Sequence, residues 1–218
     1  WYGGMARGIS ANGEIIYGTS WENSDFGMLY WINNGTSTAA PKWVGHDVKE
    51  VWEETMKMSD GTEYTTHLVN GLICQAQLTK ISPNGKWIAS SYRTETPAED
   101  RLSIVTTQTA AFYNTETETT TIVSDYGESV GVHVTDDGIG FIGIGTLGIS
   151  SGAVYDLNTG TDLGSTQEWV YDNYGIIIPA GYINYVSADG RFVLGTKAES
   201  SAGGVNFINW YIAPPVAK

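Results

Sequence analysis

The residues best suited to ligand chemistry in this sequence are aromatic and acidic side chains gathered between expected strands. Residues 165–175 contain Glu168, Trp169, Tyr171 and Tyr174. Aromatic rings stack on sugar rings, and carboxylates and amides bond hydroxyl groups. This segment is therefore a candidate surface for a carbohydrate, peptide or protein ligand. The alternative role of such aromatic side chains is to fill gaps between packed sheets.

Two further segments add polar candidates. Residues 21–26 contain Trp21 and Asp25, and residues 93–101 contain Arg93 and Glu99. A non-catalytic binding module is the first hypothesis, and no residue is assigned a catalytic role. The alternative is a polysaccharide hydrolase or lyase in which Asp25, Glu99 and Glu168 supply acid–base catalysis. A structural subunit of a surface complex is the third.

Two glycine motifs are set aside. Residues 138–143 satisfy the G-x-G-x-x-G pattern of dinucleotide sites, but a strand pattern follows where a helix is required to hold the pyrophosphate. Glycines that permit close packing of sheets are the better interpretation. Residues 148–152 match the G-x-S-x-G turn of hydrolases, yet all three histidines precede Ser150, so the hydrolase order cannot be assembled.

Metal and cofactor sites find little support. The three histidines, His46, His67 and His133, are far apart in the sequence and none has a partner at zinc-ligand spacing. The acidic turns at 136–138 and 187–190 lack the alternating acids of a calcium loop. We therefore predict no metal site and no cofactor, apart from incidental Ca²⁺ held where acidic loops converge.

Composition limits the partners. The chain has 218 residues and a net charge of −13, which repels nucleic acid. No apolar run approaches the roughly 18 residues needed for a transmembrane segment. Cys74 is the only cysteine, so no intrachain disulfide can form. Because the sequence begins with Trp1, we expect a processed chain or a piece of a longer one.

Internal repeats determine the expected fold. An Asx-Gly hairpin recurs with its glycine at residues 13, 85, 138 and 190, at intervals of 72, 53 and 52 residues. An aromatic strand, a second turn and, in the first three units, a last strand follow each hairpin. Four-stranded antiparallel units at such periods are typical of β-propeller blades. We predict one all-β propeller over residues 1–218, with units at 5–49, 75–125, 130–165 and 182–218 and an insertion at about 50–74.

The repeats resemble known families. Residues 81–90 (ISPNGKWIAS) with 112–123 (FYNTETETTTIV) are similar to TolB-type, WD-like propeller repeats. Residues 6–20 (ARGISANGEIIYGTS) with 28–31 (MLYW) resemble the HAF repeats of extracellular bacterial proteins. The resemblance implies a bacterial protein that is secreted, periplasmic or on the cell surface. It also implies binding on the face that carries the long loops, and four units that either close a small ring or belong to a larger one.

Overall fold

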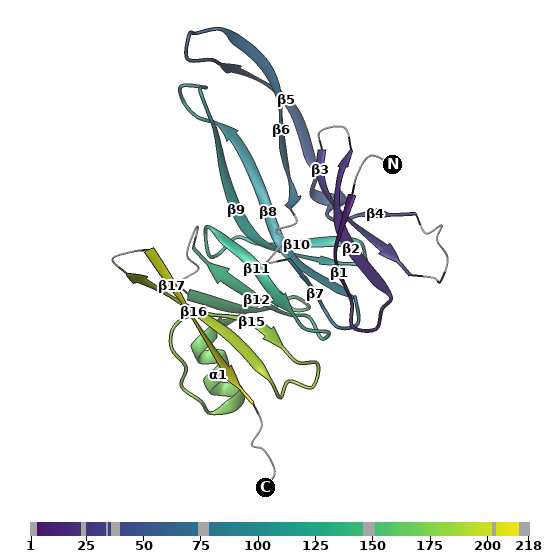
Figure 1. The fold of residues 1–218 in the computed structure, drawn as a ribbon, viewed down its shortest axis with the longest axis vertical. Helices are drawn as coiled ribbons and strands as arrows, with labels where there is room; N and C mark the ends of the chain where they lie inside the picture. The colour runs from purple at the N-terminus through teal and green to yellow at the C-terminus, as the bar shows by residue number, and fades with distance from the viewer. Residues whose placement is uncertain are drawn as a thin grey trace.

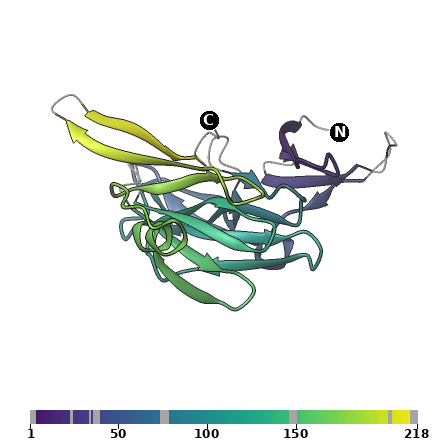
Figure 2. The same ribbon diagram turned by 90° about the horizontal axis from the view of Figure 1, so that it is seen from below.

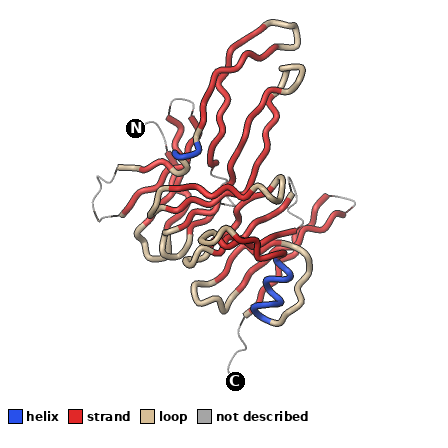
Figure 3. The backbone as a smooth tube through the Cα atoms, turned by 180° about the vertical axis from the view of Figure 1, so that it is seen from behind, coloured by secondary structure: helices blue, strands red, loops and turns tan. Residues whose placement is uncertain are grey.

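The computed structural model describes residues 4–22, 25–33, 35, 40–73, 79–145, 151–201 and 204–213. Within these residues nearly all regular structure is antiparallel strand, which confirms the predicted all-β class. The described helices are the short 3₁₀ helix η1 (His46–Val48) and α1 (Thr166–Tyr174), shown in blue in Figure 3. None of the described helices has the length and apolar character to cross a bilayer.

The described strands form four sheets that follow one another along the chain (Figure 1). The first sheet contains β1 (Gly4–Ile9), β2 (Ile15–Glu22), β3 (Asp25–Ile32) and β4 (Lys42–Trp43). The third contains β11 (Ser129–Val134), β12 (Ile139–Ile144), β13 (Ser151–Asp156) and β14 (Thr161–Ser165). The fourth contains β15 (Tyr182–Val186), β16 (Val193–Ser201) and β17 (Gly204–Ile212). Each pairs its strands in chain order.

The second sheet is larger because the segment from Glu50 to Ile73 forms a hairpin joined to its edge. Its order is β10-β9-β8-β6-β5, and β7 also pairs with β8. The strands are β5 (Glu50–Lys57), β6 (Glu63–Ile73), β7 (Lys80–Ile81), β8 (Trp87–Pro97), β9 (Ile104–Asn114) and β10 (Thr119–Val123). The hairpins β5–β6 and β8–β9 project together from the body as a long arm, at the top of Figure 1.

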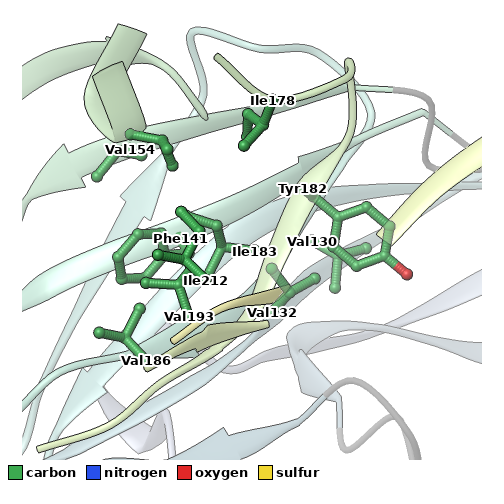
Figure 4. Packing of buried hydrophobic residues seen from close by; sticks show 11 residues of the cluster. Val130, Val132, Phe141, Val154, Ile178, Tyr182, Ile183, Val186, Val193 and Ile212 are labelled. Carbon is green, nitrogen blue, oxygen red and sulfur yellow. The ribbon is translucent and has the colours of Figure 1, made fainter. Parts of the chain in front are cut away.

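Three apolar clusters of described residues hold neighbouring sheets together. Alternation along a strand sends successive side chains to opposite faces, so Ile88 packs towards the first sheet and Ala89 towards the third. In β9, Tyr113 likewise packs towards the first sheet and Phe112 towards the third. The cluster between the third sheet, α1 and the fourth sheet includes Phe141 (Figure 4). Burial of a large apolar side chain such as Ile88 or Phe112 stabilises the fold by about 1.5–3 kcal/mol.

The four Asx-Gly turns share a hydroxyl residue two positions before the Asx. In each turn this Ser or Thr hydroxyl donates to the Asx side chain, and its carbonyl accepts the N–H of the glycine. The turns are Ser10–Gly13, Ser82–Gly85, Thr135–Gly138 and Ser187–Gly190. Each glycine has a positive φ, between 67° and 83°, which a residue with a Cβ rarely adopts.

The first three turns are also bonded to one another in chain order. The Asn12 side-chain amide donates to the carbonyl of Asn84 at 3.0 Å, and the Asn84 backbone N–H donates to Asp136 Oδ1 at 2.8 Å. The inner strands of three sheets carry a bulge at a matching position. The bulged residues, each six positions before the turn glycine, are Arg7, Val132 and Asn184. The repeat unit therefore includes this bulge as well as the turn.

The G-x-G-x-x-G segment is a strand in the structure. Its residues form the third-sheet strand β12 and the turn before it, and Gly140 lies against the ring of Phe112 from the second sheet. A Cβ at Gly140 would lie 2.8 Å from that ring. This glycine therefore permits close packing of the two sheets, as expected from the sequence. Ser150 and Cys74 lie outside the described residues.

Candidate functional site

A cleft of about 260 Å³ opens between the first sheet and the base of the arm. Apolar side chains from β3, β6 and β9 form part of its wall, including Met28, Leu72 and Ile104. The polar groups that line it come from η1 and the residues next to it, and from β6 and β8. They are His46, Lys49, His67, Arg93 and Glu95. Apolar walls with a few converging polar groups are typical of ligand sites.

The cleft exists because β6 and β8 separate. They pair only from Gly71–Arg93 to Ile73–Ser91, and beyond Gly71 side chains replace the backbone ladder. Asn70 Oδ1 accepts the N–H of Glu95 at 3.0 Å, and Glu95 Oε2 accepts the N–H of Val69 at 3.0 Å. These bonds satisfy the backbone donors at the fork, so the two hairpins can diverge with little loss of hydrogen bonding.

Arg93 and Glu95 form an ion pair within the cleft wall. Glu95 is only 9% exposed, so its charge depends on Arg93 and on the Val69 amide for stabilisation. Arg93 Nε is buried and has no hydrogen-bond partner among the described residues. An unsatisfied buried donor costs about 1–3 kcal/mol. Of the predicted ligand-binding residues whose side chains the structure describes, Arg93 is the one that lines this cleft.

Trp43 also lines the cleft. The ammonium group of Lys49 lies 5.4 Å from the centroid of its ring, within range of a cation–π contact. Gly27 makes room for the ring, because a Cβ at this position would lie 2.0 Å from it. In the sequence, Trp43 lies in the first predicted repeat unit, at 5–49. Its position just before the insertion is the signal that could have marked it.

The tip of the arm carries Glu99, which is exposed in the turn between β8 and β9. The same turn is attached to β5 through Arg101. Its carbonyl accepts the N–H of Lys57 at 2.9 Å, and its guanidinium donates to Glu54 Oε1 at 2.6 Å and to the carbonyl of Thr55 at 2.7 Å. The two hairpins therefore meet at the tip as well as at the base.

Glu168 occupies the first turn of α1, where it completes a capping box. Ser165 Oγ accepts the N–H of Glu168 at 3.2 Å, and Glu168 Oε2 accepts the N–H of Ser165 at 2.8 Å. These bonds to the carboxylate hold the pKa of Glu168 below its ordinary value. From the sequence, residues 165–175 are expected to lie between strands and no helix is predicted there, although the pattern Ser-x-x-Glu is a helix-start signal in the sequence.

The aromatic residues of α1 have different environments. Trp169 packs edge-on against Phe141 at 5.0 Å between ring centroids, and Tyr174 lies 5.8 Å from Trp169. The Tyr174 hydroxyl donates to the carbonyl of Gly190 at 2.6 Å. Tyr171 is 57% exposed. Trp169 and Tyr174 therefore help join α1 to the third and fourth sheets, whereas Tyr171 faces outwards.

The predicted site residues do not form one cluster in the described structure. Glu99 lies on the turn at one end of the long axis and α1 lies near the other (Figure 1). Trp21 lies near the end of β2 and Asp25 begins β3, but their side chains are outside the described part of the chain. Arg93 lies at the base of the arm. Among the described residues, no three His, Cys, Asp or Glu side chains are grouped to hold a metal ion.

Comparison with known proteins bears on the fold of the chain. No known protein family matches the sequence, and no curated protein matches it. Among solved structures, TolB from Acinetobacter baumannii superposes with a TM-score of 0.51 at 12% identity, over 97% of this chain and 41% of that one. The tricorn protease superposes with a TM-score of 0.32 at 9% identity, over 95% of this chain and 24% of that one.

The present chain thus spans about two-fifths of the length of the TolB chain that it matches. The identity is too low to carry activity or ligand from one protein to the other. The agreement in strand arrangement over almost all of the chain supports the fold that the repeats predicted. The chain is an all-β protein with a TolB-like propeller fold.

Proposed function

We propose that the chain is a non-catalytic binding module that holds a peptide or protein ligand in the cleft between the first sheet and the arm. The observation that carries this proposal is the fork between β6 and β8, which opens a walled cleft at the base of two long hairpins. Trp43 and the apolar walls would bury a side chain of the ligand, and Arg93 and Glu95 would orient it by polar contacts.

The arm supports a macromolecular ligand. Large apolar side chains are exposed along both hairpins, among them Met58, Tyr64, Leu102 and Val105. These side chains continue the apolar character of the cleft over a long surface, which suits an extended peptide or a protein face better than a small molecule. Function on projecting loops and hairpins held by a rigid sheet scaffold is common.

Carbohydrate is the less favoured ligand. Of the aromatic residues predicted to stack on sugars, Trp169 and Tyr174 pack against neighbouring sheets, which leaves Tyr171 as the exposed ring on α1. A polysaccharide hydrolase or lyase is less favoured for a related reason. Two of its three acids, Glu99 and Glu168, lie at opposite ends of the molecule, so they cannot act on one glycosidic bond.

The same proposal takes the four sheets as successive propeller blades, with the repeat units at 5–49, 75–125, 130–165 and 182–218 and the insertion at about 50–74. The sheets pack in chain order, and the first and fourth lie at opposite ends of the row (Figure 2). This arrangement supports four blades of a larger ring over a small closed one. An exported or surface location in a bacterium is proposed from the HAF resemblance, and cell fractionation tests it.

Selection from a displayed library of random peptides tests the proposed function. We expect peptides that bind the protein and lose at least about tenfold in affinity, or 1.4 kcal/mol, in a Val69→Trp variant that fills the cleft. Ile122→Trp, at an exposed position on β10, is the control and should bind normally. Equal binding by both variants would contradict the proposed site. A parallel glycan array tests the carbohydrate alternative.

A further inference from the structure

The cleft between the first sheet and the arm differs in charge from the molecule as a whole. Lys49 and Arg93 line it, and Glu95 is the one carboxylate among its described lining residues. The two histidines of the lining, His46 and His67, are neutral or positive at every pH. Two cations and one carboxylate leave the lining with a net positive charge, in a chain that carries −13.

Three other hollows in the described structure have the opposite character. One lies beside α1, one lies between α1 and the turns of the third and fourth sheets, and one lies beside β14. None of them has a Lys or Arg among its described lining residues. Their acidic lining residues are Glu168 and Asp172 in the first, Asp136, Asp137 and Asp189 in the second, and Asp162 and Glu168 in the third. The positive cleft is therefore a local departure from an acidic surface.

The carboxylate of Glu95 is already engaged within the protein. Its Oε1 pairs with Arg93, and its Oε2 accepts the N–H of Val69 at 3.0 Å. Arg93 Nε, by contrast, is a donor with no hydrogen-bond partner among the described residues. The Arg93 side chain is 38% exposed, so part of it faces the cleft. The lining thus offers donors and positive charge to a ligand, and an anionic acceptor complements them best.

Two acids of β5 lie near the fork but do not line the cleft. Glu53 Oε1 lies 3.6 Å from His67 Nε2, and Glu50 Oε2 accepts the side-chain amide of Asn70 at 3.2 Å. Both carboxylates are exposed, where water and salt screen their charge. They reduce the attraction of an anion from a distance, but they leave the charge of the lining itself positive.

We infer that the cleft takes an acidic residue of a peptide or protein ligand, an Asp or Glu next to a large apolar side chain. This inference rests on the proposed binding function and adds the chemistry of the ligand. The carboxylate would meet the positive charge of Lys49 and Arg93, and its apolar neighbour would pack on Trp43 and Leu72.

Charge also separates a carboxylate from other anions. The lining has one net positive charge, which matches a carboxylate more closely than a phosphorylated side chain, at about −1.5 to −2. A nucleic acid strand would bring many phosphates close to a chain that carries −13, and the two would repel each other.

Three displayed peptide libraries test the inference. They share random flanks and differ in a central residue fixed as Glu, Gln or Lys, and cleft binders are the clones that lose binding to Val69→Trp. We expect cleft binders chiefly from the Glu library, with affinities at least about fivefold above those of their Gln counterparts.

The outcomes of this selection are distinct. Equal yields of cleft binders from the Glu and Gln libraries would overturn the inference and leave the proposed function standing. The absence of cleft binders from all three libraries would contradict both. Tighter binding after the central Glu is replaced by phosphoserine would overturn the assignment to a carboxylate.

A pair of lysine variants tests whether the attraction is local. Lys49→Gln should weaken the best Glu peptide at least about fivefold and its Gln counterpart less than about twofold. Lys86→Gln is the matched control, because Lys86 is also partly buried, lies outside the cleft lining, and loses the same charge. It should bind both peptides normally. Equal losses in the two variants would show an effect of net charge alone and would overturn the inference.

Discussion

The imidazole Nε2 of His133 accepts a hydrogen bond of 3.0 Å from the backbone N–H of Val186, and this bond joins the third sheet to the fourth. The ring is buried between Phe141 and Tyr185, with centroids 5.7 and 5.4 Å away. Burial, assisted by the positive charge of Lys80, lowers the pKa of His133 to about 4. The bond requires a neutral imidazole, because a protonated one cannot accept at Nε2.

The free energy of unfolding should therefore fall as the pH drops. A histidine with a lowered pKa binds a proton in the unfolded chain before it does so in the folded one, so stability is full above about pH 6.5 and is lost on the way to pH 4. The full contribution is about 3 kcal/mol. Urea unfolding at several pH values in this window measures it. His133→Gln keeps an acceptor without the titration and should show a smaller slope.

Gly131 allows close approach of the second and third sheets. A Cβ there would lie 2.7 Å from the carbonyl oxygen of Ser90 and 2.9 Å from that of Ala111. We expect Gly131→Ala to destabilise the protein by about 1–3 kcal/mol, because rigid backbone must move. Gly71→Ala is the control, since its nearest neighbour would be an ordinary 3.6 Å contact with Lys49. Equal thermal midpoints for the two variants would contradict this role of Gly131.

Trp169 should contribute to stability as part of the core between α1 and the sheets. Trp169→Ala removes the contact with Phe141 and should lower the free energy of unfolding by about 3 kcal/mol. Tyr171→Ala, on the same helix at an exposed position, should change it by less than about 0.5 kcal/mol. Chemical denaturation compares them. If Trp169→Ala unfolds with the same free energy as the unmodified chain, Trp169 is not a core residue and becomes a candidate ligand contact again.

The capping box of α1 gives a further prediction. Ser165→Ala removes the acceptor for the N–H of Glu168 and should cost about 1 kcal/mol. Glu168→Gln retains the second half of the box, because an amide oxygen also accepts the Ser165 N–H. We expect the Gln variant to unfold close to the unmodified chain in thermal denaturation. A larger loss in the Gln variant than in Ser165→Ala would show that the charge of Glu168 has another partner.

The repeat pattern carried enough local information to predict the fold. An Asx-Gly turn with its hydroxyl residue closes within a few residues, as in Ser82–Gly85, so its signal is present in the sequence. The apolar alternation at Ile88 and Ala89 likewise depends on neighbours in the strand. The helix α1 was missed although Ser165 and Glu168 carried its capping signal.

The candidate cleft could not be predicted in the same way. It depends on where β6 stops pairing with β8, and that fork is fixed by Asn70 and Glu95, which are 25 residues apart. Neither residue belongs to a motif. The sequence predicts Arg93 in a connection between strands, at 93–101, but Arg93 lies within β8. Its partner Glu95 and the nearby cleft residue Trp43 become recognisable only once the sheets are packed together.

The bonds between successive turns bear on how such a chain can grow by duplication. A copied repeat must fit the repeat before it and the repeat after it, and Asn12, Asn84 and Asp136 form such joints with turn residues alone. A gene segment that carries the four-residue turn therefore carries its own connector. Insertions placed elsewhere, such as the β5–β6 hairpin between the first and second Asx-Gly turns, leave these joints intact, so new surfaces can arise without loss of the fit between neighbouring units.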